Sequence, residues 1–238
     1  PAPAADATRP LYLDEAAIQT PSVALGHATR EALRMVDALD AMIVGTRDAM
    51  KATDRDALAR ARRLDDVLDA LNRELRRYLT RLDPDGLTDD EHRRIEAILA
   101  FAFNLESAGD VLERNIGASL AKRFKRDAAF SADARAPVDH AFEAVRGNLR
   151  LAASVFTTGD AGAARDLADQ KAAFRRREAE ERRAHLARLR EGAPPGDAAA
   201  IDLLRDVKRH NGYLVAGAAY PVLEAAGVLA PSRLLDSD

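Results

Sequence analysis

The feature that most constrains this sequence is a series of helix-start signals along its whole length. A helix start needs a side chain that accepts hydrogen bonds from the free N–H groups of the first turn, and Ser, Thr, Asp and Asn supply it best. Thr88, followed three positions later by Glu91, forms a capping box, which is a specific signal of this kind. Together the signals predict six helices, over about residues 20–51, 53–82, 88–125, 131–158, 160–190 and 197–221, the last of which must kink or end at Pro221.

The composition agrees with an all-α fold. Charged residues make up 32% of the 238 residues and aromatic residues 5%, a balance typical of long helices with exposed faces. The formal net charge of −3 provides no global basic field, and no DNA-binding motif is present, so a nucleic-acid partner is not expected. The absence of cysteine excludes disulfides and thiolate metal sites.

Two internal correspondences indicate a tandem repeat. The second predicted helix ends in YLTRL (78–82) and the fifth in HLARL (185–189). Glu106 and Asp110 of the third helix correspond to Asp206 and His210 of the sixth. We therefore expect a six-helix bundle of two three-helix repeats, over residues 20–127 and 128–238, preceded by a linker or N-terminal extension at 1–19.

The third helix contains a costly residue next to a repulsive pair. Gly109 costs ~1 kcal/mol relative to alanine inside a helix, and Glu106 and Asp110 are like charges one turn apart. Gly109 lies on an apolar stripe, where a small residue lets a neighbouring helix approach closely or leaves room for a bound group. Asp65 and Asp69 form a similar pair on the second helix.

Two interpretations of these acidic pairs are open. If the second and third helices are neighbours, the pairs could face each other, and carboxylates on facing helices of a bundle can hold a divalent cation. Oxygen ligands suit Mg, Mn, Ca or iron. The alternative is an ordinary solvated face, on which the acids pair with Arg114 or Arg62.

Three stretches of the sequence resemble known proteins. NLESAGD (104–110) is similar to the signature of PhoU domains, which consist of two three-helix repeats with acidic E/D-x-x-x-D motifs on the second and third helix of each. HLARLREG (185–192) with DLLRDVKRHNGYLVAGAAYPVLE (202–224) resembles the C-terminal domain of bacterial sodium/phosphate cotransporters. PLYLDEAAIQTPSVALGHATREALRM (10–35) resembles the segment that joins their membrane part to that domain. The resemblance covers nearly the whole chain from residue 10 and implies a PhoU-like fold.

The resemblance also implies a set of metal ligands. In the first repeat the positions of the family's ligands are occupied by Asp65, Asp69, Glu106 and Asp110. The second repeat departs from the pattern, because the sixth helix has Asp206 with His210 in place of an acid, and the fifth has Ala172 and Arg176 where acids are expected. The imidazole of His210 suits Zn or Fe. We expect one divalent or transition-metal site in the first repeat (Mg, Mn, Fe, Zn or Ca) and a lost or altered one in the second, with no organic cofactor.

The function implied by the resemblance is regulatory. We expect a soluble domain at the cytoplasmic face of the inner membrane, belonging to a sodium-dependent phosphate transporter whose membrane part is not in this chain. Its partners would be that membrane part or phosphate-uptake components, and a homodimer is left open. The alternatives are a metal-free helical adaptor and, with less support, a carboxylate metal-centre enzyme. No set of catalytic residues can be argued from spacing, so no enzymatic activity is expected.

Overall fold

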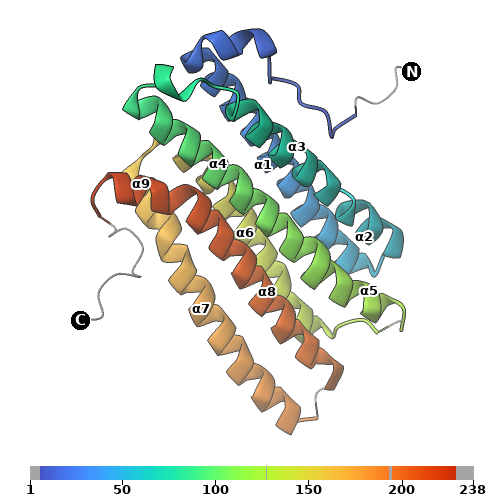
Figure 1. Cartoon of the computed structure of the whole chain (residues 1–238). Coiled ribbons are helices and arrows are strands. Elements are labelled where there is room, and N and C mark those ends of the chain that lie inside the picture. Colours follow the sequence, from blue (N-terminus) through green and yellow to red (C-terminus); the bar gives the residue numbers. More distant parts are fainter. Residues whose placement is uncertain (1–5, 127, 193–194, 229–238) are drawn as a thin grey trace, which may run out of the picture.

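The computed structural model describes residues 6–126, 128–192 and 195–228, and every regular element in these ranges is a helix (Figure 1). The predicted all-α fold is therefore confirmed. Within the described residues, no helix is both long and apolar enough to cross a membrane.

The first half of the chain forms three long helical segments. One is α1 (Pro21–Ala52), the second is split into α2 (Arg55–Arg62) and α3 (Asp65–Leu79), and the third consists of α4 (Asp89–Asp110), the π-helical segment η3 (Val111–Gly117) and α5 (Ala118–Phe124). Two short 3-10 turns, η1 (Glu15–Gln19) and η2 (Pro84–Gly86), precede α1 and α4.

The second half also forms three long helical segments. They are α6 (Ala132–Thr158), α7 (Ala161–Arg190), and a third composed of α8 (Ala198–Leu214), the π-helical segment η5 (Val215–Ala219) and α9 (Tyr220–Ala225), with the 3-10 turn η4 (Pro195–Asp197) before α8. The third segment of each half thus includes a π-helical stretch. The tandem repeat and its boundaries stay predictions.

Local capping chemistry sets several of the helix starts. The Thr88 hydroxyl accepts from the Glu91 N–H, and the Glu91 carboxylate accepts from the Thr88 N–H, so the predicted capping box is present. The side chains of Ser131 and Asp160 accept from the N–H groups of Ala134 and Ala163 and so cap α6 and α7. At the second helix the cap is Asp54, which accepts from two backbone N–H groups.

Three predicted helices are less regular than their patterns suggest. The second breaks at residues 63–64, and the third passes through η3. The sixth continues past Pro221 to Ala225, because the π-helical turn η5 lies where the proline ring would otherwise clash with the carbonyl four residues earlier.

The two halves pack against each other through α1 and α4 on one side and α6 and α8 on the other. The rings of Phe101 on α4 and Phe156 on α6 stack with centroids 4.1 Å apart in this core. At the surface of the same contact, the Arg146 guanidinium forms an ion pair with Asp40 on α1, with Nε and Oδ1 2.7 Å apart. These contacts join α4 and α1 of the first half to α6 of the second.

The N-terminal segment from Asp6 onward lies against the bundle. The carboxylate of Glu31 on α1 is fully buried and accepts from the backbone N–H groups of Leu11 (2.9 Å) and Tyr12 (2.8 Å). Arg34, one turn further along α1, forms an ion pair with Glu31 and donates to the backbone carbonyl of Arg9 at 3.0 Å. A buried carboxylate with these partners fixes the path of the segment that leads into α1. Residues 1–5 of the predicted linker lie outside the described residues.

Candidate functional site

The seam between α3 and α4 contains the acidic residues that the sequence singles out, and its closeness depends on Gly109. A Cβ atom at this position would lie 2.5 Å from Leu68 Cδ1 and 2.8 Å from Asp65 Oδ1, closer than van der Waals contact allows. The glycine therefore lets α3 pack directly against α4 and brings the Asp65 carboxylate over the backbone of α4. This is the physical reason for a glycine in the middle of the helix.

Asp65 is the most perturbed acid of the seam. It is 7% exposed, and its Oδ1 is buried without a hydrogen-bond partner. Burial, and after it the charges of Asp69, Asp110 and Glu113, raise the pKa of Asp65 to about 7. A carboxyl group in this state gains from any cation that approaches it.

Asp69 and Glu106 share this environment from opposite helices. The pKa of Asp69 is raised by burial and by the charge of Asp110. The pKa of Glu106 is raised by burial and by the charges of Asp110 and Asp69. The structure thus brings the four acids predicted in the first repeat into mutual electrostatic contact across the seam.

Two arginines neutralise part of the charge. Arg114 Nε lies 3.0 Å from Asp110 Oδ1, so the predicted alternative of pairing with Arg114 holds for this acid. Arg62 forms its ion pair with Glu113 instead. Glu113 is a member of the seam that the sequence analysis missed, although its position seven residues after Glu106 places it near the same face of the helix.

The side chains of the seam are of the type that binds a divalent cation, but they are not arranged around a common point. Within the described residues, no group of three or more His, Asp or Glu side chains is arranged to hold a metal ion. The donor set nevertheless consists of carboxylates with raised pKa, one of which has an oxygen without a partner. Asp65, Asp69, Glu106 and Asp110 would have to turn toward a common ion to bind it.

The acids and histidine predicted in the second repeat do not form a comparable group. His210 is 1% exposed, and its Nδ1 lies 2.9 Å from the carbonyl oxygen of Ala108 on α4, while its Nε2 has no partner. Burial lowers the pKa of His210 to about 4, so the ring is neutral and Nδ1–H is the donor. Burial also raises the pKa of Asp206, and the charges that act on it come from α8 itself. Ala172 and Arg176 are exposed on α7.

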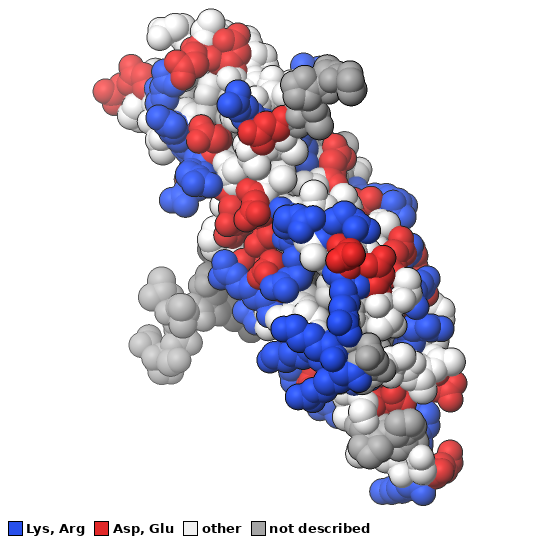
Figure 2. Space-filling view, turned by 90° about the vertical axis from the view of Figure 1, so that its right-hand side faces the viewer, with Lys and Arg blue, Asp and Glu red and all other residues white. Residues whose placement is uncertain are grey.

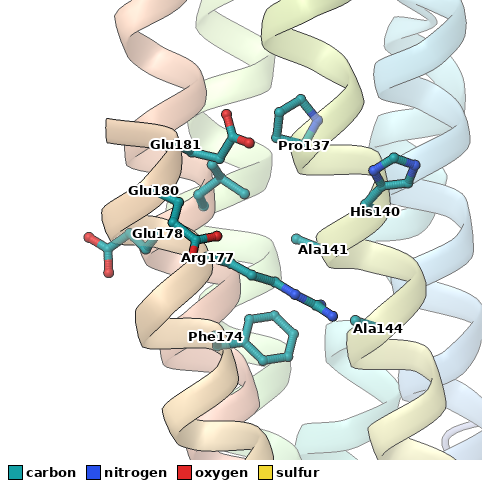
Figure 3. Close-up of a pocket in the computed structure, with 10 residues that line it drawn as sticks. Pro137, His140, Ala141, Ala144, Phe174, Arg177, Glu178, Glu180 and Glu181 are labelled. Carbon is teal, nitrogen blue, oxygen red and sulfur yellow. The ribbon is translucent and has the colours of Figure 1, made fainter. Parts of the chain in front are cut away.

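A cavity of about 380 Å³ between α6 and α7 was not foreseen from the sequence (Figure 3). Its apolar wall includes Phe174 on α7 and Ala141 and Ala144 on α6, whose small side chains leave the space open. Arg177 extends from α7 toward α6 across this space, and Glu180 contributes to the same wall. The mixed charges around the cavity favour no single class of ligand.

Comparison with known proteins finds relatives whose name refers to phosphate export. Relatives named "Putative inorganic phosphate export protein YjbB" in Salmonella typhimurium, Escherichia coli K12 and Shigella flexneri are each 36% identical to it over 220 residues. The match covers 91% of this chain but only 40% of each relative, so the chain spans less than half the length of these proteins. No protein-family model matches the chain. No solved structure matches it. The relatives support a phosphate-related family, whereas the resemblance to PhoU domains and to sodium/phosphate cotransporters stays a prediction.

The same relatives contradict the predicted localisation. They are named as export proteins, and phosphate export proteins are membrane proteins. The expectation of a soluble domain at the cytoplasmic face of the inner membrane is therefore wrong.

Proposed function

We propose that this chain is the regulatory part of a phosphate transport protein and that it responds to a divalent cation bound between α3 and α4. The observation that carries the proposal is the seam itself, where carboxylates of Asp65, Asp69 and Glu106 have raised pKa values because burial and their neighbours' charges disfavour the ionised form. A cation would remove this repulsion. Natural helical bundles use facing carboxylates in this way.

The donor set favours a hard cation. Carboxylate oxygens suit Mg, Mn and Ca better than Zn, which prefers nitrogen and sulfur, and iron remains compatible with carboxylates. Asp65 and Asp69 would hold the ion from α3, and Glu106 and Asp110 from α4. The bound cation would supply positive charge that draws the two helices together. For the ion to regulate transport, the protein must have two conformations that bind the ion with different affinity.

The phosphate role rests on the relatives. Their printed name concerns export of inorganic phosphate, and this chain matches 40% of their length. The proposed partner is the remaining part of such a longer protein. Sodium dependence, the phosphate-uptake partners, a homodimer, the absence of a nucleic-acid partner and the absence of enzymatic activity stay predictions.

A metal-free adaptor is the second candidate. It is favoured by the Asp110–Arg114 ion pair and by the lack, in the described part of the chain, of a ready-made group of three metal-binding side chains. In that case the domain acts through protein contacts alone. The cation-responsive regulator and the metal-free adaptor differ in one respect: only the first requires the charges of the seam for its effect on transport.

The proposal can be tested by measuring phosphate transport. The assay uses a protein as long as the relatives, of which this chain is a part. We would replace Asp69 and Glu106 together by Asn and Gln, and compare the rate of phosphate release from cells or vesicles with that of an Asp66→Asn control, which changes an exposed acid of α3. The proposal predicts that the double variant responds to added divalent cation at least tenfold less than the parent and the control. An unchanged response would favour the metal-free adaptor.

A further inference from the structure

The outer face of α3 presents a groove lined by arginines. Arg73, Arg76, Arg77 and Thr80 line this depression of about 380 Å³. Their spacing of three, four and seven residues places them on one side of the helix, and all four side chains are exposed. On the side of the bundle where α2, α3 and α5 lie, basic side chains gather in patches with acidic ones between them (Figure 2).

Most of the positive charge of the groove is not neutralised. Arg77 has an acidic neighbour in Glu74, with Nη1 and Oε1 3.8 Å apart. Among the residues that the structure describes, neither Arg73 nor Arg76 has an ion-pair partner. The Thr80 hydroxyl donates to the carbonyl of Arg77 at 3.0 Å, which leaves the guanidinium groups as the free donors.

We propose that Arg73, Arg76 and Arg77 form a binding site for a phosphate group. A guanidinium presents N–H donors in a planar fork that matches two phosphate oxygens, and adjacent arginines on one helix face can contact the same anion. The group is either inorganic phosphate or the headgroup of an anionic phospholipid, since both offer the same oxygens. The inference rests on the proposed phosphate role but not on the cation site.

Arg73 also connects the groove to the acidic seam. The guanidinium is close enough to Asp69, one turn earlier on α3, for its charge to act on that carboxyl group. A phosphate at the groove and a cation at the seam would therefore attract each other through a few residues of one helix. By linkage, each ligand tightens the binding of the other.

A simpler role for these side chains predicts a different outcome. Arg76 and Arg77 lie in the last turn of α3, where positive charge stabilises the helix end. If that were their only role, replacing arginines would lower stability and leave any effect of phosphate unchanged. The response to phosphate separates the two roles.

The experiment uses the full 238-residue chain, freed of metal with chelator, and follows its thermal melting as sodium phosphate replaces sodium chloride at constant ionic strength. Variants Arg73→Ala/Arg76→Ala and Arg175→Ala/Arg176→Ala are compared, the second pair being exposed arginines of α7 outside the groove. A parallel arm measures co-sedimentation with phosphatidylglycerol vesicles and with neutral phosphatidylcholine vesicles.

The proposal predicts that at least one arm shows binding by the parent and the α7 variant, with roughly tenfold weaker binding by the α3 variant, the size expected for losing charge-assisted contacts. A phosphate-dependent rise in melting temperature identifies inorganic phosphate, and selective sedimentation with phosphatidylglycerol identifies a headgroup. Equal responses of both variants, or no response in either arm, would overturn it. Neither readout contains a metal or measures transport, so this failure is distinct from failure of the proposed function.

Discussion

Removing the charge of Asp65 should make the metal-free protein less sensitive to pH. The pKa of Asp65 is raised to about 7 in the folded chain by burial and then by the charges of Asp69, Asp110 and Glu113, whereas the unfolded chain has an ordinary aspartate pKa of about 3.9. Between these values the folded protein holds a proton that the unfolded chain has released. Stability from this group is therefore present below about pH 4 and is lost as the pH rises through 7.

The magnitude follows from the same difference. Each pH unit within the window changes the free energy of unfolding by at most about 1.36 kcal/mol. About two pH units of the window lie above pH 5, because the folded pKa is about 7, and the total change between pH 5 and pH 8 is therefore about 2 kcal/mol. An Asp65→Asn variant keeps the shape of the side chain and removes this contribution.

Urea unfolding of chelator-treated protein at pH 5 and pH 8, followed by far-ultraviolet circular dichroism, measures the effect. The quantity compared is the free energy of unfolding of Asp65→Asn minus that of the parent. This difference should be about 2 kcal/mol larger at pH 8 than at pH 5. Asp66→Asn, which removes an exposed charge of the same helix, should show no such difference. If Asp65→Asn differs from the parent equally at both pH values, the carboxyl group is not strained in the folded protein and the reasoning fails.

Two further predictions concern packing. Gly109→Ala should destabilise the fold by about 1–3 kcal/mol in urea unfolding, because the new methyl group overlaps α3. The control Gly212→Ala, at a position with open space around it, should stabilise the fold by about 0.5–1 kcal/mol. Equal effects of the two substitutions would refute the close approach of α3 to α4. Glu31→Ala should speed chymotryptic cleavage after Tyr12 at least tenfold while the helix content of the bundle is kept, because the N-terminal segment loses its buried acceptor. The control is Asp37→Ala, which removes an exposed acid of the same helix. Equal cleavage rates of the two variants would contradict the role of Glu31 in holding the N-terminal segment.

Features that depend on a few neighbouring residues were predictable from the sequence. The capping box of Thr88 and Glu91 and the cap at Ser131 act within one turn, so their patterns identify the starts of α4 and α6. The apolar stripe through Leu105 and Gly109 likewise identifies the buried face of α4. Periodicity and capping are local and survive in almost any tertiary setting.

Features set by tertiary packing were not predictable. The break at residues 63–64 and the π-helical segments have no local signal that differs from a continuous helix. The burial of Asp65 and the part played by Glu113 depend on how closely α3 approaches α4, which the contact at Gly109 determines. The acid spacing indicated a seam, whereas its electrostatics required the packed helices.

The most direct test of the cation proposal is calorimetric titration of the chelator-treated chain with Mn²⁺, repeated with Mg²⁺ and Ca²⁺. The parent should bind about one ion per chain with a matching rise in melting temperature. The Asp69→Asn/Glu106→Gln variant should lose both, and Asp66→Asn should keep them. Binding that is absent from the parent, or unchanged in the double variant, would contradict a cation site between α3 and α4.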